Sequence, residues 1–512
     1  MRIKPGIVLL TLIAMILTST AGAIAEAQPG ERMTISIANI DDGAYEGDPL
    51  IELVEDKLNI DIEFVPLSWS NFVEKANVMI ASDSHPDSTM TLGWNNPSAI
   101  IKWYNQGAIR ALPEDLSQWP RLKAQIEQFP EQVYDGQRIV ITRAANIDPA
   151  MRYADNSLYY RKDLFEKYSI EAPSTMEEYL ERGKALQAAL KADGKNVYLL
   201  SANKDQTFYY HFITPYGLNP EGFIQETQGE YAGKWIPATL SPTYWKALEF
   251  AQRLYQEKLL DPEFASISED EKVDKFVNGK ALSIYQNGIF GWYKLIQARW
   301  NKANPGVDFA QYCTIINEFE SPVDGKRYDA RNPNFWAGQV INANVDDAKM
   351  ARILDLCEFL LSDEGLELSR YGREGIDFVK QDGKYISLLP KNEDGTEQLA
   401  KTYYRLHNLC VTVNWGDDYH TDSTDPVYPA WHEGNFLPKI ANTILEPGLS
   451  YVRGDVIDEV DIYAPAREIA VKFIMSDMTA EDALKEYTNR LRNECQLDAY
   501  LEDLQAFAAS NG

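Results

Sequence analysis

The chain has 512 residues, with 77 acidic against 49 basic side chains and a formal net charge of −28 at pH 7. This charge repels the phosphate backbone of nucleic acids and the anionic surface of a bilayer, so we expect neither as a partner. The length allows two or three domains, each with a sizeable core.

The first 27 residues have the pattern of a secretory signal peptide. Arg2 and Lys4 precede an apolar run over residues 7–17, and small residues with candidate cleavage sites follow this run. The run is shorter than the roughly 20 residues that span a bilayer. We therefore expect a signal peptide over residues 1–27 that is cleaved on export. An uncleaved membrane anchor is the alternative.

The chain then alternates between strand and helix patterns. Strands are predicted over 33–40, 61–65 and 89–92, and apolar periodicity predicts helices over 49–58 and 71–81. This β-α-β-α-β order is typical of an α/β lobe with parallel strands. Ligands of such lobes usually bind beyond the carboxyl ends of the strands.

Further elements follow without a flexible linker. Residues 157–161 are predicted to form a strand. Ser174 and Glu177 have the spacing of a capping box before a helix over 175–192, and a second long helix is expected over 243–259. Since the chain contains no low-complexity segment, we expect strands rather than a tether to join the lobes.

The four cysteines do not form a metal-binding or redox pair in the sequence. Cys313, Cys357, Cys410 and Cys495 include no CxxC motif, and the exported context permits disulfides. Three full pairings are possible, and the sequence does not choose among them. Cys357 lies in an apolar helical stretch, which favours a buried free thiol at this position.

Several segments of the chain, taken in order, form a recognisable set. They are Tyr134-Asp-Gly-Gln-Arg-Ile-Val-Ile, Leu158-Tyr-Tyr-Arg-Lys-Asp-Leu-Phe, Pro173-Ser-Thr-Met-Glu-Glu-Tyr, Phe276 to Gly288, Leu354 to Gly365, Tyr371-Gly-Arg-Glu-Gly-Ile-Asp-Phe and Thr479-Ala-Glu-Asp-Ala-Leu. In this order they resemble bacterial extracellular solute-binding proteins of the maltose-binding type (family 1), the substrate receptors of carbohydrate ABC importers. The segment that begins at Tyr371 is similar to a motif of the longer oligosaccharide-binding branch.

The resemblance implies an α/β fold with two lobes, each a mostly parallel sheet flanked by helices, and a ligand cleft between them. The implied lobes are 33–150 with 306–375, and 151–305 with 376–512. A carbohydrate, expected to be an oligosaccharide, would close the cleft and be delivered to ABC transporter permease subunits. The implied receptor is a monomer. It would be periplasmic, because the first cysteine is Cys313 and no lipobox cysteine follows the signal segment.

A sugar site needs aromatic rings for the C–H faces of the sugar and polar groups for its hydroxyl rim. The resemblance and the predicted loops select the following candidates: Asp42, Trp94, Asn95, Tyr153, Asp155, Phe208, Tyr209, Phe290, Trp292, Trp336, Arg373 and Tyr463. Phe290 and Trp292 both follow the Asn287-Gly288 segment, and Trp292 is favoured of the two. A structural ion pair of Arg373 with Glu374 is the alternative to a ligand contact.

We expect no cofactor and no metal. Longer members of the family carry a calcium loop near residue 190, but the segment Lys191-Ala-Asp-Gly-Lys-Asn lacks the alternating oxygen ligands. The acidic cluster of Asp417, Asp418, Asp422 and Asp425 is interpreted as a solvated loop, with a metal site as the alternative.

Two other functions compete with transport. One is a receptor that feeds a sensor kinase. The other is a secreted glycoside hydrolase, which needs two carboxylates about 5–10 Å apart. The sequence contains no zinc, nucleophile-elbow, P-loop or dinucleotide motif, so we expect no enzyme.

Overall fold

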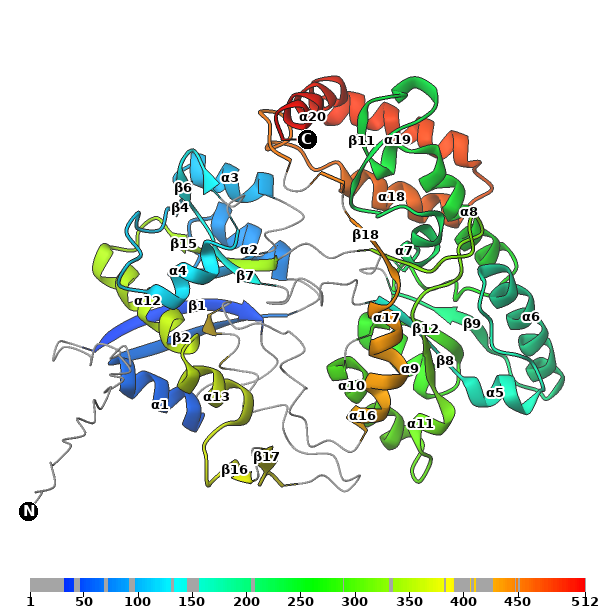
Figure 1. The fold of residues 1–512 in the computed structure, drawn as a ribbon, viewed down its shortest axis with the longest axis horizontal. Coiled ribbons are helices and arrows are strands. Elements are labelled where there is room, and N and C mark those ends of the chain that lie inside the picture. Colours follow the sequence, from blue (N-terminus) through cyan, green and yellow to red (C-terminus); the bar gives the residue numbers. More distant parts are fainter. Residues whose placement is uncertain are drawn as a thin grey trace, which may run out of the picture.

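The computed structural model describes most of the chain after the predicted signal segment. The described residues are 32–40, 47–68, 72–91, 97–129, 133–144, 156–203, 208–288, 290–330, 335–381, 384–390, 406, 409–410, 427–446, 448–449 and 452–511. They form two α/β lobes that lie side by side (Figure 1). The predicted signal peptide over 1–27 lies outside the described residues.

A six-stranded sheet forms the centre of the first lobe. β1 pairs parallel with β2 and β3, whereas β15 runs antiparallel to β3, β4 and β7. The strands are β1 (Met33–Ile40), β2 (Ile60–Leu67), β3 (Ser88–Thr91), β4 (Ile109–Arg110), β7 (Ile141–Ala144) and β15 (Phe335–Asn342). The strand and helix order expected for residues 33–92 is therefore confirmed.

The first helix shows why the sequence pattern is predictive here. α1 (Pro49–Leu58) begins at Asp48, whose carboxylate accepts a hydrogen bond from Leu50 N at 2.9 Å, and Pro49 occupies the first turn. The helix ends at Asn59, which adopts a left-handed conformation with φ 54°. The other helices of this lobe are α2 (Phe72–Ala81), α3 (Pro97–Asn105), α4 (Pro120–Ile126), α12 (Asp347–Leu360) and α13 (Asp363–Tyr371).

Gly338 permits the close approach of β7 to β15. A side chain at this position would place its Cβ 2.3 Å from Val140 Cγ1 and 2.9 Å from Ile141 O. Two small hairpins also belong to this part of the molecule, β5 (Val133–Tyr134) with β6 (Gln137–Arg138), and β16 (Phe378–Gln381) with β17 (Lys384–Ser387).

The second lobe contains a four-stranded sheet in the order β13-β8-β12-β9. β12 pairs antiparallel with β8 and parallel with β9, and β13 pairs antiparallel with β8. These strands are β8 (Asn156–Tyr160), β9 (Tyr198–Ser201), β12 (Ala281–Asn287) and β13 (Thr314–Ile316). The described strands of each sheet run in one direction except for a single reversed strand, as the expected mostly parallel sheets require. The reversed strand is β15 in the first sheet and β8 in the second, and each is the first described strand after the chain passes from one lobe to the other.

The long helices predicted for the second lobe are confirmed as α6 (Met176–Ala192) and α8 (Pro242–Gln256). The predicted capping box of Ser174 and Glu177 is wrong by one residue. Thr175 is the N-cap, and its hydroxyl and the Glu178 side chain form the reciprocal bonds, because the helix begins only at Met176.

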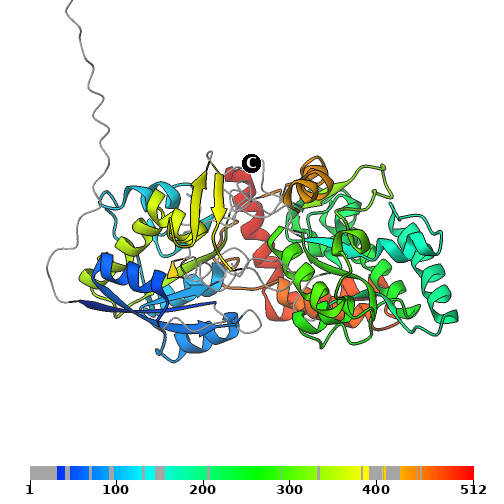
Figure 2. The same cartoon turned by 90° about the horizontal axis from the view of Figure 1, so that it is seen from below.

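Other short and C-terminal elements complete the second lobe. Its C-terminal helix α20, red in Figures 1 and 2, lies toward the junction of the lobes. These elements are α5 (Lys162–Lys167), α7 (Tyr210–Ile213), β10 (Phe223–Gln225), β11 (Trp235–Pro237), α9 (Glu269–Val277), α10 (Phe290–Ala303), α11 (Phe309–Tyr312), β14 (Tyr328–Ala330), α16 (Tyr428–Trp431), the π-helix η7 (His432–Phe436), α17 (Leu437–Ile440), β18 (Thr443–Leu445), α18 (Tyr463–Ile474), α19 (Ala480–Glu494) and α20 (Leu497–Asn511), with short 3₁₀ turns at Thr214–Tyr216, Gly229–Tyr231 and Ala238–Leu240.

Several described parts of the chain lie elsewhere than the expected lobe ranges place them. α11, β13 and β14 belong to the second lobe, where β13 extends the sheet by pairing with β8 and β14 pairs with β18. The hairpin β16–β17 belongs to the first lobe, and Leu406, Leu409 and Cys410 pack in its core, although the range 376–512 was expected in the second. The other expected boundaries stay a prediction.

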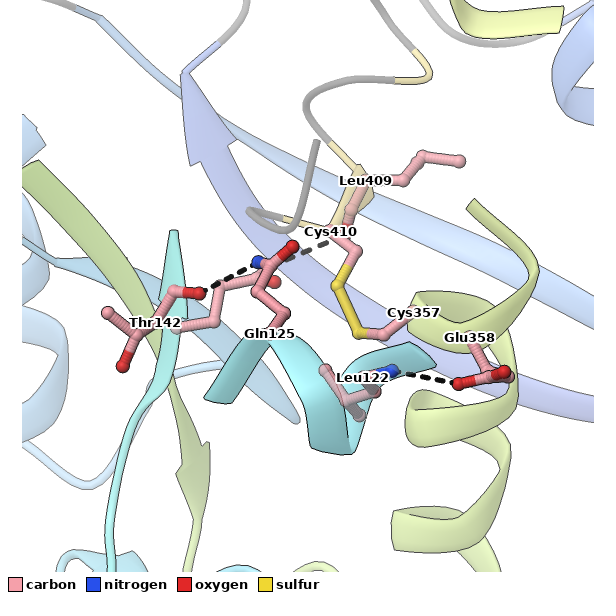
Figure 3. The surroundings of a disulfide bond; sticks show 8 residues. Leu122, Gln125, Thr142, Cys357, Glu358, Leu409 and Cys410 are labelled. Atoms are coloured by element: carbon pink, nitrogen blue, oxygen red, sulfur yellow. Dashed lines mark hydrogen bonds between the residues drawn. A yellow bond between two sulfur atoms is a disulfide. The ribbon is translucent and has the colours of Figure 1, made fainter. Parts of the chain in front are cut away.

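A disulfide joins Cys357 and Cys410, so the expectation of a free thiol at Cys357 is wrong (Figure 3). The apolar helical pattern around Cys357 predicted its burial correctly, but burial does not distinguish a thiol from a disulfide when the partner comes from a distant segment. The bond fixes Cys410 to α12, and Gln339 donates to Leu409 O at 3.4 Å beside it. Cys313 and Cys495 are free and buried.

Candidate functional site

The chain path defines which edge of each sheet faces the other lobe. β7 is followed by β8, and β14 by β15, so the chain passes between lobes from the end of β7 and into the beginning of β15. Because β1 and β3 run antiparallel to β15, they end at the same interlobe edge. β9, β12 and β13 end at the corresponding edge of the second sheet, since β12 and β13 run antiparallel to β8 and β9 runs parallel to β12.

The interlobe edge of the first sheet carries a buried amide. Asn39, near the end of β1, is 2% exposed, and its Nδ2 has no hydrogen-bond partner among the described residues. A buried donor without a partner is costly, so a group that accepts a hydrogen bond is expected near it. Five candidates that follow the strands of this lobe lie outside the described residues: Asp42, Trp94, Asn95, Tyr153 and Asp155.

The corresponding edge of the second sheet is also rich in amides. Asn203 follows β9, and its buried Oδ1 has no partner within the described part of the chain. Asn317 follows β13, accepts from Ser157 Oγ at 3.3 Å and donates to Asn435 O at 2.8 Å. Asn287 ends β12. Such side chains supply both donors and acceptors, as a hydroxyl-rich solute requires.

Buried polar groups hold the end of β12 in place. Gln286 donates to Glu269 and accepts from Asn287 N at 2.7 Å, while Tyr159 OH donates to Asn287 O at 3.0 Å. Lys272 donates to Tyr285 O at 2.8 Å. Burial lowers the pKa of Lys272 to about 8, and Glu269 opposes this effect. The turn after β12 is thus positioned by a preformed network.

α10 begins beyond this turn and places its two aromatic candidates, Phe290 and Trp292, on different faces of the helix. Phe290 is buried and packs in an aromatic cluster, with ring centroids 5.0 Å from Tyr428 and 5.2 Å from Trp431. Trp292 is two residues further along the helix, about 200° around it, and is half-buried. The segment is helical rather than extended, and Trp292 is the residue of the two that keeps an accessible ring.

The remaining candidates differ in their surroundings. The backbone of Trp336 lies at the interlobe beginning of β15. Arg373 forms an ion pair with Asp377, at 2.8 Å between Nε and Oδ2, rather than with Glu374. Phe208 is buried in the second core, with ring centroids 5.4 Å from Phe264. In this conformation Arg373 and Phe208 have structural partners.

Tyr209 and Tyr463, predicted from distant parts of the sequence, meet at one cluster around Glu221. Tyr463 OH donates to Glu221 O at 3.0 Å, and Tyr210 OH donates to Glu221 Oε1 at 3.1 Å. Burial raises the pKa of Glu221 to about 7, although Arg467 and the Tyr210 hydroxyl favour its ionised form. Tyr209 is buried beside Tyr210, at 5.2 Å between ring centroids.

Sequence reasoning missed Glu221 and Arg467. Arg467 follows Tyr463 by four residues in α18, so both lie on one face of that helix. This spacing was available in the sequence. Nothing in the sequence places Glu221 beside them, because its segment is more than 200 residues away in the chain.

Other features lie away from these edges. A pocket lined by Leu112, Glu114, Lys123, Glu127 and Arg138 is next to β4, which pairs with the far end of β15. Within the described ranges, no helix has the length and apolar character needed to cross a membrane.

Two α/β lobes with polar strand ends on facing edges, joined by chain crossings, define a two-lobed solute-binding protein. The chain belongs to the family of bacterial extracellular solute-binding proteins, whose sequence profile matches residues 43–310.

Known proteins agree with this membership. The lipoprotein LipO of Bacillus subtilis (strain 168) is 23% identical over 358 residues, 67% of each chain. The polygalacturonan/rhamnogalacturonan-binding protein YtcQ of the same organism is 22% identical over 377 residues, 73% of this chain and 70% of that protein. In structure, the chain is similar to the alginate-binding protein AlgQ2 without calcium ion, with a TM-score of 0.72 and 16% identity over 94% of this chain and 99% of that one.

Proposed function

We propose that the protein captures a carbohydrate of oligosaccharide size between its lobes and delivers it to the permease of an ABC importer. The carrying observation is that the interlobe edges of both sheets present amides, with Asn39 on one side and Asn203 and Asn287 on the other. Trp292 adds a half-buried ring at the second edge. This combination of planar amides and an aromatic ring suits the rim and the face of a sugar.

The relatives support a carbohydrate as the solute. One is named for binding pectic polysaccharides and one for binding alginate. The similarity in sequence is low, so the identity of the sugar does not transfer. The amide-rich edges of this chain are the independent support, because apolar solutes would leave these groups without partners.

The proposal is tested by thermal unfolding with a panel of neutral and uronate-containing oligosaccharides. A solute that binds the folded state raises the unfolding temperature, and the increase grows with the logarithm of solute concentration above the dissociation constant. We expect at least one oligosaccharide to raise this temperature and to saturate in calorimetry. A complete carbohydrate panel without any shift would exclude the proposed solute class.

The two competing functions are separated by simple measurements. A glycoside hydrolase would convert the bound oligosaccharide, so its recovery intact after long incubation supports capture. A receptor for a sensor kinase would bind the same solute, but deletion of its gene would abolish the response that the solute induces through the kinase and leave uptake of the solute intact. We propose that deletion of this gene abolishes uptake of the solute.

We also propose that the protein acts outside the cytoplasm as a monomer, released by cleavage after the signal segment. The family is extracellular, and one relative is a lipoprotein. Mass spectrometry of the exported protein tests this: a mature N-terminus near residue 28 supports cleavage, and an N-terminus at residue 1 in the membrane fraction supports an anchor.

A further inference from the structure

A lysine is buried in the second lobe at the point where the chain crossings enter it. Lys439 lies in α17, is 2% exposed, and has its Nζ 3.3 Å from Oδ2 of Asp329, which is 0% exposed. Buried lysines are rare and are retained when they are paired. The ion pair of Lys439 and Asp329 is therefore an uncommon feature of the second lobe that calls for a physical role.

Lys439 and Asp329 lie at the second-lobe ends of two of the chain crossings, the one from β7 to β8 and the one from β14 to β15. Asp329 is the middle residue of β14, which pairs with β18 and is the last described strand before the chain returns to the first lobe as β15. Lys439 Nζ also donates to Ser157 Oγ at 3.4 Å. Ser157 is the second residue of β8, the first described strand after the chain leaves β7.

Other titratable groups lie close to this pair. Burial and the adjacent Asp329 raise the pKa of Glu318 well above its ordinary value, and Thr214 Oγ1 donates to its carboxyl at 3.1 Å. Burial and the charge of Lys439 lower the pKa of His211 to about 3. Arg327 donates to the backbone oxygen of Glu318 and forms an ion pair with Glu320 at 2.8 Å. Asp329 is the carboxylate in ion-pair contact with Lys439.

We propose that Lys439 and Asp329 anchor the β7–β8 and β14–β15 crossings to the second lobe and thereby set the equilibrium between open and closed lobes. The two are positioning residues and contact no solute. The inference rests on the proposed capture of a solute by lobe closure. The Lys439 ammonium holds β8 and β14 together, so these strands do not shift within the second lobe when the lobes rotate. The pair therefore determines how far apart the lobes lie without solute.

The test replaces both partners, Lys439→Met with Asp329→Asn. This double variant removes the charges while keeping the volume, and such replacements of a buried pair are often tolerated. The single variant Lys439→Met leaves a buried carboxylate without its cation, so we expect a large fall in unfolding temperature and use it only to show that the pair is formed. Small-angle X-ray scattering then measures lobe separation without solute.

A matched control lies at the other end of β8. Arg161 and Asp163 form a partly buried pair at 2.7 Å, beyond the carboxyl end of that strand. Arg161→Met with Asp163→Asn perturbs the same lobe without touching the crossings. We expect the anchor variant to change the radius of gyration without solute, and the control variant to leave it unchanged.

The oligosaccharide found for the wild-type protein gives the second measurement. We expect its affinity to change by about threefold or more in the anchor variant, because the open and closed populations shift. Unchanged scattering and unchanged affinity in a folded anchor variant would overturn the proposal. If no oligosaccharide binds the wild-type protein, the proposed function fails, while scattering without solute still decides whether the anchor sets lobe separation.

Discussion

Trp292 and Phe290 lie two residues apart and are expected to respond in opposite ways to truncation. Trp292→Ala should lower oligosaccharide affinity about tenfold, since a stacked ring contributes about 1–2 kcal/mol. Its unfolding temperature should change little, because the ring is only half-buried. Phe290→Ala should lower the unfolding free energy by about 3–5 kcal/mol, because its ring fills the core.

Calorimetry and chemical denaturation of both variants check these expectations. Trp292→Phe is the conservative control and should retain part of the affinity. An unchanged affinity in Trp292→Ala would remove this residue from the site, and a fully stable Phe290→Ala would contradict its place in the aromatic cluster.

Glu221 is expected to make stability depend on pH. Burial raises its pKa from 4.5 to about 7 in the folded protein, so the folded state binds a proton more tightly than the unfolded chain. This contribution is present below pH 4.5 and is lost as the pH rises toward 7, by at most about 3 kcal/mol. Glu221→Gln should remove this pH dependence.

The comparison must be made as a difference between variant and wild type. His211 acts in the opposite direction. Its pKa is lowered to about 3 in the folded protein, so the folded protein loses stability as the pH falls below 6.5. Urea denaturation at pH 5, 6, 7 and 8 supplies the values. If the difference between Glu221→Gln and the wild-type protein is the same at all four pH values, the Glu221 carboxyl does not titrate in this range.

Only part of the site can be predicted from residue types. Arg373 was expected to bind solute or to pair with Glu374, but four residues of turn bring Asp377 to it instead. Phe208 was expected to reach solute from an aromatic-rich loop, but its ring packs against Phe264 in the core of the second lobe. A sequence shows which side chains suit a sugar, but not which of them the core uses.

The disulfide is expected to stabilise the first lobe. It joins residues 53 positions apart, and closing a loop of this length in the unfolded chain corresponds to about 4 kcal/mol in the chain-entropy account. We expect Cys357→Ala with Cys410→Ala to lower the unfolding temperature markedly. The readout is differential scanning calorimetry.

Thiol counting gives the control for the disulfide. The unfolded, non-reduced wild-type protein should expose two free thiols, Cys313 and Cys495, and four after reduction. Four free thiols before reduction would show that Cys357 and Cys410 are not joined.

Local sequence signals predicted helices and strands well where capping residues and apolar periodicity alone determine the bounds of the element. Asp48 and Pro49 define the beginning of α1, and the periodicity of residues 49–58 defines its length. The adjacent Ser174 and Thr175 are both acceptable caps, and the chain uses Thr175. The antiparallel direction of β8 and β15 follows from the crossings between lobes, which no local pattern reports.

At the scale of the whole molecule, the two lobes have separate cores. One contact between the lobes is the Arg453 guanidinium of the second over the Tyr134 ring of the first, at 5.2 Å. Separate cores permit the lobes to rotate as rigid bodies. The order of family-like segments predicted this architecture. The residue ranges of the lobes follow only from strand pairing in the structure, such as that of β13 with β8.

The central claim is that an oligosaccharide is held between the lobes and closes them. It is tested most directly by small-angle X-ray scattering of the wild-type protein with and without a saturating oligosaccharide from the thermal panel. We predict a smaller radius of gyration with the sugar, and a smaller decrease in Trp292→Ala at the same sugar concentration, because its weaker affinity leaves more of the variant without sugar. Saturated binding with an unchanged radius of gyration in the wild-type protein would contradict the account.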